Sequence, residues 1–322
     1  MSTAELPGRD GERALRALDL PVRRRLEGLL HGDHAGLRSG QGSEPDEARP
    51  YQPGQDDVRR MDWNVTARSV EPHVRAPLAE REMQTWVLVD ASASMDFGTA
   101  LLEKRELATA AVAAVGLLTD GPGNRLGARV ARGDALELVP AGGGRAARRR
   151  LLRTLLARPG APPGAQPPTD LARCLARLHR DHPRPGLRVV VSDFHDGADR
   201  SDTGLPPWTA PLRRLAARHE VIAAEVIDPR ELELPDVGLV TLVDPVSGRR
   251  RDVPTGSRLL RDRYAAAARA HRERNAAAFR AAGAAHLKLH TDRDWVREIA
   301  VFTAARRRSA ARRPPTGRAR IR

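Results

Sequence analysis

Three oxygen-bearing side chains, Asp90, Ser92 and Ser94, follow the apolar run 85–89 at alternate positions. The run is β-branched, aromatic and uncharged, which predicts a buried strand that ends at the carboxylate. Small residues, Ala91 and Ala93, separate the three and allow a tight turn in which their oxygens point the same way. Hard oxygen ligands suit Mg²⁺, Mn²⁺ or Ca²⁺ rather than Zn²⁺. The spacing therefore predicts part of a divalent-cation site.

Two further oxygen ligands follow other predicted elements. Asp193 comes directly after the predicted strand 187–192, and Thr169 directly precedes a predicted helix. In an open α/β sheet, ligands bind beyond the carboxyl ends of the strands. Each of these residues alone also fits an ordinary role as a turn or helix cap. Together they predict a cation site whose mostly neutral oxygens would leave the ion able to accept a carboxylate from another molecule. Its ligands are Asp90, Ser92, Ser94, Thr169 and Asp193.

Alternating strand and helix patterns place these residues in a doubly wound, mostly parallel α/β sheet flanked by helices. Strands are expected at 85–90, 125–131, 135–139, 187–192, 221–227 and 285–290. Helices are expected at 101–118, 145–157, 170–180, 210–218 and 257–282, and from 295 onward. Ser257 is a predicted N-cap, Gly283 a predicted helix end, and Thr291 the predicted cap of the last helix.

The predicted domain covers residues 82–306 and includes a β-hairpin insertion near 238–253. Residues 1–81 are expected to form a helix over 14–31 and an irregular extended segment that packs on this domain. Residues 307–322 are expected to be a disordered, arginine-rich tail.

Composition narrows the cellular setting. Of the 322 residues 40% are hydrophobic, which supports a packed core, and the single cysteine, Cys174, fits a reducing compartment. The N-terminus lacks the apolar core of a signal peptide, and no stretch approaches the roughly 20 apolar residues that a membrane helix requires. We therefore expect a cytoplasmic protein without membrane insertion.

The formal net charge is +14, and residues 306–322 contain eight arginines and no acidic residue. Such a tail could attract nucleic acid electrostatically. No aromatic residues are interleaved with the charge as in a base-stacking surface, so nucleic-acid binding is the weaker interpretation.

The pattern Asp90-x-Ser92-x-Ser94, with Thr169 and Asp193, resembles the metal-ion-dependent adhesion site of von Willebrand factor type A domains. Upstream, residues 49–63 read Arg-Pro-Tyr-Gln-Pro-Gly-Gln-Asp-Asp-Val-Arg-Arg-Met-Asp-Trp and resemble the hallmark of the domain of unknown function 58 family. Residues 192–194, 228–235 and 244–248 continue this similarity. The resemblance implies a bacterial adaptor that works with a MoxR-type AAA+ ATPase in assembly or maturation of other proteins, and no catalysis.

The upstream motif contains dense mixed charge around two aromatic residues. One interpretation is a lid that lies across the sheet, with Tyr51 and Trp63 as buried anchors. The other is a docking surface for a partner. The residues concerned are Arg49, Tyr51, Asp56, Asp57, Arg59, Asp62, Trp63 and Arg68.

The leading hypothesis is a non-catalytic, metal-dependent interaction module, with Mg²⁺ as the expected ion, that binds an acidic side chain of a partner protein. The alternative is a metal-dependent phosphate-ester hydrolase with Asp90 as nucleophile. Such enzymes usually have a second carboxylate two residues on, and Ser92 cannot transfer protons at neutral pH. A third possibility is nucleic-acid binding through the basic tail.

Overall fold

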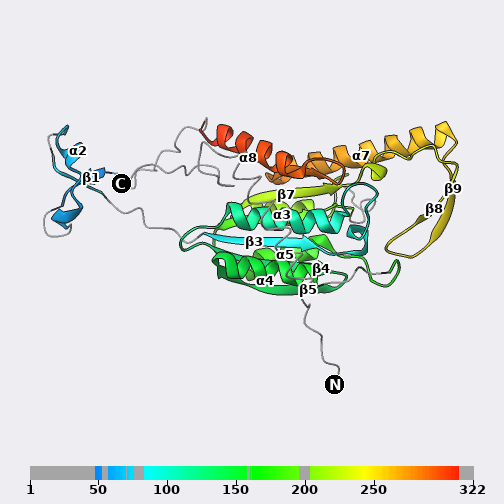
Figure 1. The fold of residues 1–322 in the computed structure, drawn as a ribbon, viewed down its shortest axis with the longest axis horizontal. Coiled ribbons are helices and arrows are strands. Elements are labelled where there is room, and N and C mark those ends of the chain that lie inside the picture. The colour runs from blue at the N-terminus through cyan, green and yellow to red at the C-terminus, as the bar shows by residue number, and fades with distance from the viewer. Residues whose placement is uncertain are drawn as a thin grey trace, which may run out of the picture.

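The computed structural model describes residues 48–52, 57–69, 71–75, 83–157, 160, 162–195 and 204–311. A six-stranded sheet lies at its centre (Figure 1), with the strand order β10-β7-β6-β3-β4-β5. Its strands are β3 (Gln84–Asp90), β4 (Arg125–Arg132), β5 (Ala135–Gly143), β6 (Gly186–Ser192), β7 (Glu220–Ile227) and β10 (Ala285–His290). All neighbouring pairs are parallel except β4 and β5. The predicted mostly parallel sheet is confirmed.

The strand order reverses beside β3. From β3 the chain adds β4 and β5 on one side, then returns to place β6, β7 and β10 on the other. Such a reversal opens a crevice at the carboxyl ends of the two strands where it occurs, here β3 and β6. Asp90 ends β3 and Ser192 ends β6, so the predicted ligands begin at this crevice.

Helices cover both faces of the sheet. Successive residues of β3 point to opposite faces, so Val87 and Val89 belong to one apolar layer and Trp86 and Leu88 to the other. The first layer is covered by α3 (Lys104–Leu118), α4 (Gly144–Leu156) and α8 (Trp295–Ala311). The second is covered by α5 (Leu171–Asp181), α6 (Thr209–Ala216) and α7 (Arg258–Ala282).

Predicted helix ends agree with the structure at both ends of α7, at the end of α3 and at the start of α8. Ser257 caps α7 through the amide of Leu260, and Gly283 ends it with φ +74°. α3 begins at Lys104, three residues later than predicted. Thr291 does not cap α8: the carboxylate of Asp294 accepts from the amide of Arg297 instead. α8 also continues to Ala311, beyond the predicted domain boundary at 306.

The predicted insertion is an antiparallel hairpin of β8 (Leu239–Val243) and β9 (Arg250–Pro254). Asp244 stabilises its turn by accepting hydrogen bonds from the amide of Val246 and the hydroxyl of Ser247, both at 3.0 Å or less. Figure 1 shows the hairpin standing away from the central sheet beside the first turns of α7.

The N-terminal segment forms a small unit of its own elements. These are β1 (Ala48–Pro50), η1 (Val58–Arg60), α2 (Trp63–Thr66) and β2 (His73–Arg75), with β1 and β2 paired antiparallel. Its packing on the main domain stays a prediction. The predicted helix over 14–31 and residues 312–322 of the predicted tail lie outside the described residues.

Candidate functional site

The turn after β3 brings Asp90, Ser92 and Ser94 together. The amide of Ser92 donates to Asp90 Oδ1 at 2.9 Å, which folds the chain back over the strand end. Ser92 precedes the short helix η2 (Ala93–Met95), and the hydroxyl oxygens of Ser92 and Ser94 lie 3.1 Å apart. Through these two contacts the side chains of Asp90, Ser92 and Ser94 lie next to one another at the strand end.

The end of β6 supplies the other half of the site across the crevice. Ser192 Oγ donates to Asp90 Oδ2 at 2.7 Å and so joins the two neighbouring strands. Ser94 donates a side-chain hydrogen bond to Asp193, while the amide of His195 donates to Asp193 Oδ1 at 3.1 Å. Both carboxylates are buried, Asp90 at 8% exposure and Asp193 at 3%. Four of the five predicted ligands therefore converge.

Thr169 has a different contact. It lies buried at the neighbouring turn after β4, where its hydroxyl oxygen accepts a hydrogen bond from the amide of Gly133 at 2.9 Å. Asp170, not Thr169, is the N-cap of α5. Thr169 is thus on the same edge of the sheet, but no hydrogen bond of the described residues joins it to the other four ligands.

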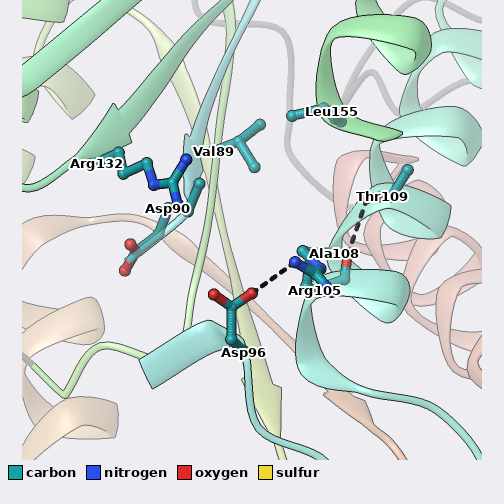
Figure 2. Close-up of a pocket in the computed structure, with 9 residues that line it drawn as sticks. Val89, Asp90, Asp96, Arg105, Ala108, Thr109, Arg132 and Leu155 are labelled. Atoms are coloured by element: carbon teal, nitrogen blue, oxygen red, sulfur yellow. Dashed lines mark hydrogen bonds and ion pairs between the residues drawn. The ribbon is translucent and has the colours of Figure 1, made fainter. Parts of the chain in front are cut away.

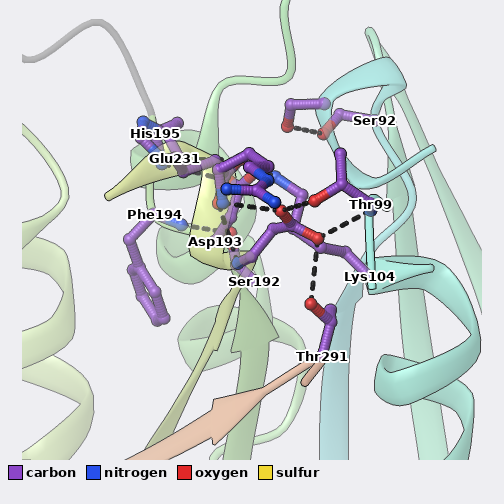
Figure 3. Close-up of polar contacts among 12 residues, drawn as sticks. Ser92, Thr99, Lys104, Ser192, Asp193, Phe194, His195, Glu231 and Thr291 are labelled. Carbon is purple, nitrogen blue, oxygen red and sulfur yellow. Dashed lines mark hydrogen bonds and ion pairs between the residues drawn. The ribbon is translucent and has the colours of Figure 1, made fainter. Parts of the chain in front are cut away.

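A lysine that the sequence interpretation missed completes the site (Figure 3). Lys104, the first residue of α3, is fully buried, and its Nζ donates to Asp193 Oδ2 at 2.8 Å. It also donates to a carboxylate oxygen of Glu231, the last residue of η4 (Pro229–Glu231). Burial alone would lower the pKa of Lys104, but the charges of Asp193 and Glu231 outweigh burial and raise it. The site therefore contains a permanent ammonium.

The two site aspartates carry opposite pKa shifts. Burial would raise the pKa of Asp193, but the ammonium of Lys104 outweighs this effect and holds that pKa well below its usual range. Burial, followed by the negative charge of Asp193, raises the pKa of Asp90. Asp193 is therefore held in its charged form, whereas Asp90 binds a proton more readily than an exposed aspartate does.

A third buried carboxylate, Asp228, joins the loops around the site, and the sequence did not predict it. It follows β7 and accepts hydrogen bonds from Thr99 N at 2.9 Å, Thr99 Oγ1 at 2.5 Å and Thr291 Oγ1 at 2.9 Å. Burial would raise its pKa, but these hydrogen bonds lower it. The amide of Asp228 in turn donates to Glu231. Lys104 and Asp228 thus share Glu231 as a neighbour.

The donor set fits a hard divalent cation. No cluster of three or more His, Cys, Asp or Glu side chains suited to a metal occurs in the part of the chain that the structure describes. A cation here would therefore need the hydroxyls of Ser92 and Ser94 as well as the carboxylates of Asp90 and Asp193. Such oxygen ligands are those that Mg²⁺ and Ca²⁺ prefer, and a cation would offset the repulsion between the two aspartates.

A pocket beside Asp90 has two basic residues in its wall (Figure 2). Arg105 of α3 and Arg132, at the end of β4, both line it together with Asp90. Arg105 is held by Asp96 at 3.0 Å and retains 32% side-chain exposure. Asp96 lines the same pocket, so the two arginines face two carboxylates there, Asp90 and Asp96.

The upstream motif residues serve local structure in the part of the chain that is described. Asp57 accepts from the amide of Arg59, and Asp62 caps α2 by accepting from the amides of Asn64 and Val65. Trp63 is 67% exposed, so its predicted role as a buried anchor is wrong within the described residues.

Tyr51 is half-buried and Arg68 is exposed, while Arg49 lies in β1. Asp56 lies outside the described residues. The use of this motif as a docking surface stays a prediction.

Comparison with known sequences places the chain in a family. The family described as "Protein of unknown function DUF58" matches residues 47–274. The chain belongs to the DUF58 family.

Uncharacterized proteins of Mycobacterium tuberculosis H37Rv and Mycobacterium bovis are both 52% identical to this DUF58 chain over 297 residues. The alignments cover 92% of this chain and 90% of each relative. An uncharacterized protein of Mycobacterium avium is 44% identical over 172 residues, which cover 53% of this chain and 95% of the relative.

Solved structures similar to this chain include the conserved hypothetical protein BatB of Bacteroides thetaiotaomicron. It is 13% identical, with a TM-score of 0.40 over 72% of this chain and 100% of BatB. The von Willebrand factor type A domain of SpRpn10 is 11% identical, with a TM-score of 0.38 over 68% of this chain and 94% of that domain. Within the described residues, none of the helices combines the length and the apolar character needed to cross a membrane.

Proposed function

We propose that this DUF58 protein is a non-catalytic interaction module that binds an acidic side chain of a partner protein through a divalent cation, with Mg²⁺ as the expected ion. The observation that carries the proposal is the convergence of oxygen groups from β3 and β6 where the strand order reverses. Asp90, Ser92, Ser94 and Asp193 would hold the ion, with Thr169 at the adjoining turn.

A bound divalent cation would supply electrophilic attraction for a carboxylate oxygen. The protein's own residues would select and orient that carboxylate. Arg132, beside Asp90 in the wall of the adjoining pocket, would attract the carboxylate of a partner. No second carboxylate sits two residues after Asp90, and this supports binding over hydrolysis.

For the partner, we propose a MoxR-type AAA+ ATPase, and for the setting the cytoplasm. Membership of the DUF58 family supports this partner, because the sequence resemblance implies it. The single cysteine, Cys174, is buried in α5, which fits a reducing compartment. Pull-down of a co-expressed MoxR-type ATPase, with and without EDTA, tests the partner separately from the ion.

The ion and the partner both depend on Asp90 in this proposal. Asp90→Ala should weaken Mn²⁺ binding, measured by titration calorimetry, at least tenfold (roughly 1.4 kcal/mol or more) and abolish capture of the ATPase. Asp90→Asn keeps the shape of the side chain and should show the same loss, with an unchanged circular dichroism spectrum.

Asp262→Ala is a matched control, because Asp262 is 69% exposed and its ion pair with Arg258 on α7 spans 3.8 Å. This variant should bind Mn²⁺ and the ATPase as the unaltered protein does. Capture that persists in Asp90→Ala would contradict the proposal. Metal-dependent turnover of a phosphate ester that is lost in Asp90→Asn would instead support a hydrolase.

A further inference from the structure

Lys104 places a fixed positive charge against the proposed cation site. Its Nζ lies 2.8 Å from Asp193 Oδ2, and the two side chains are only 1% and 2% exposed. Water and salt screen a buried pair far less than a surface pair. The ammonium of Lys104 would therefore repel a divalent ion bound to Asp193.

The residue type at this position is itself informative. Of the 55 lysines and arginines in the chain, only Lys104 and Lys288 are lysines. Arginine carries a broad planar guanidinium, whereas lysine carries a compact ammonium with three donors on a flexible stem. Among the described residues, the buried basic side chain that contacts the site is thus the smaller cation, which can move between neighbouring acceptors without displacing the side chains around it.

Glu231 gives the ammonium a second acceptor. One of its carboxylate oxygens accepts from Lys104, and the other accepts from the amide of Asp228 at 3.2 Å. The capping box of η4 therefore holds Glu231 in place whether or not Lys104 contacts Asp193. Figure 3 shows Lys104 between Asp193 and Glu231, on the side of the site that faces α3.

We propose that Lys104 is a tethered cation that competes with the divalent ion for Asp193, and that Glu231 receives the ammonium when the ion binds. The affinity of the site for its ion is then set by this competition. The inference rests on the cation site of the proposed function and adds the group that regulates it. It makes ion occupancy, and with it partner binding, sensitive to the position of η4.

The test is Mn²⁺ titration of the full chain, followed by calorimetry and by the electron paramagnetic resonance signal of free Mn²⁺. Lys104→Met removes the competing charge and should lower the Kd at least about tenfold, given the strength of charge interactions at such distances. Lys288→Met is the matched control: it removes the same charge from the exposed lysine of β10 and should leave the Kd unchanged.

Glu231→Gln should have the opposite effect, because Lys104 then keeps Asp193 as its only carboxylate partner. We expect weaker Mn²⁺ binding in this variant. If the lost negative charge of Glu231 acted directly on the ion, Glu231→Gln would weaken Mn²⁺ binding equally when Lys104 is replaced by methionine. In our proposal Glu231 acts through Lys104, so the effect of Glu231→Gln should largely vanish in the double variant.

The double variant Lys104→Met/Glu231→Gln also covers the case in which Lys104→Met alone fails to fold, because it leaves fewer buried charges unpaired. If the Kd of both variants equals or exceeds that of the unaltered protein, the inference about Lys104 is wrong. The proposed cation site is not contradicted by that result. Absence of Mn²⁺ binding in the unaltered protein and in both variants overturns the cation site itself.

Discussion

Phe194 directly follows the site residue Asp193 and has φ +55°, the only positive φ among the described non-glycine residues. This conformation is costly for a bulky residue, by about 1–3 kcal/mol. Burial of the side chain compensates this conformational cost. The ring centroid of Phe194 lies 5.1 Å from that of Trp208 and 4.8 Å from that of Phe279, and the residue is 1% exposed. Its amide also donates to Ser192 Oγ. An aromatic anchor in the core thus fixes the backbone that presents Asp193.

Phe194→Ala should remove this anchor and keep the strained backbone. Loss of a buried aromatic side chain predicts a decrease of about 3–5 kcal/mol in the free energy of unfolding, measured by urea denaturation. Phe194→Leu retains most of the apolar volume and should cost clearly less. Equal stability of the alanine variant and the unaltered protein would show that the ring does not hold this turn.

At the scale of elements, one buried carboxylate joins three loops. Asp228, after β7, binds Thr99 in the segment before α3 and Thr291 after β10. The loops on the carboxyl edge are therefore tied to each other and not only to their own strands. This arrangement also explains why Thr291 is unavailable as a helix cap.

Thr291→Val should lower the free energy of unfolding by about 1.5–3 kcal/mol, because a hydrogen bond to a buried charged acceptor is lost. Thr291→Ser keeps the hydroxyl and serves as the control, with a smaller loss. Thermal or urea unfolding of the two variants measures the difference. If serine and valine destabilise the protein equally, the hydroxyl contact with Asp228 is not what stabilises this edge.

The sequence contained enough local signal to predict the elements but only part of the site. Valine-rich segments such as 187–192 predicted the strands, and Asp90, Ser92 and Ser94 could be found because their spacing is local. Lys104, Ser192 and Asp228 were missed because their partners are distant in the chain: Ser192 and Asp90 are 102 positions apart, and Asp228 and Thr99 are 129 apart. No periodic pattern records such a pairing, which is created by strand order.

At the scale of the whole molecule, the two ends of the sheet differ in their buried charged residues. The carboxylates of Asp90 and Asp193 lie at the carboxyl ends of the strands, and Arg188 lies near the amino ends. Near the amino ends of the strands, buried Arg188 lies close to several histidines. Burial, with the positive charges of Arg129 and Arg188, lowers the pKa of His182 to about 4. Burial, followed by the charge of Arg188, lowers the pKa of His219 to about 4 as well. Both histidines are therefore neutral in the folded protein at neutral pH.

The pKa of these histidines is about 6.5 in the unfolded chain and about 4 in the folded protein. The free energy of unfolding should therefore fall as the pH is lowered from about 6.5 to about 4. In that window the unfolded chain binds protons that the folded chain does not, so stability rises with pH. Urea denaturation at a series of pH values measures the slope. His219→Gln cannot titrate and should show a shallower slope. An identical slope in this variant would exclude His219 as a contributor.

The reversal of strand order beside β3 also has a consequence for synthesis of the chain. Domains form during translation from the N-terminus onward, so β3, β4 and β5 leave the ribosome before β6. A nascent chain that has emerged only as far as residue 180 carries Asp90 and Lys104 but neither Asp193 nor Glu231. At that stage Lys104 lacks both of its carboxylate partners. Asp193 and Glu231 reach Lys104 only after β6 and η4 have left the ribosome, so this buried cluster is completed late in synthesis.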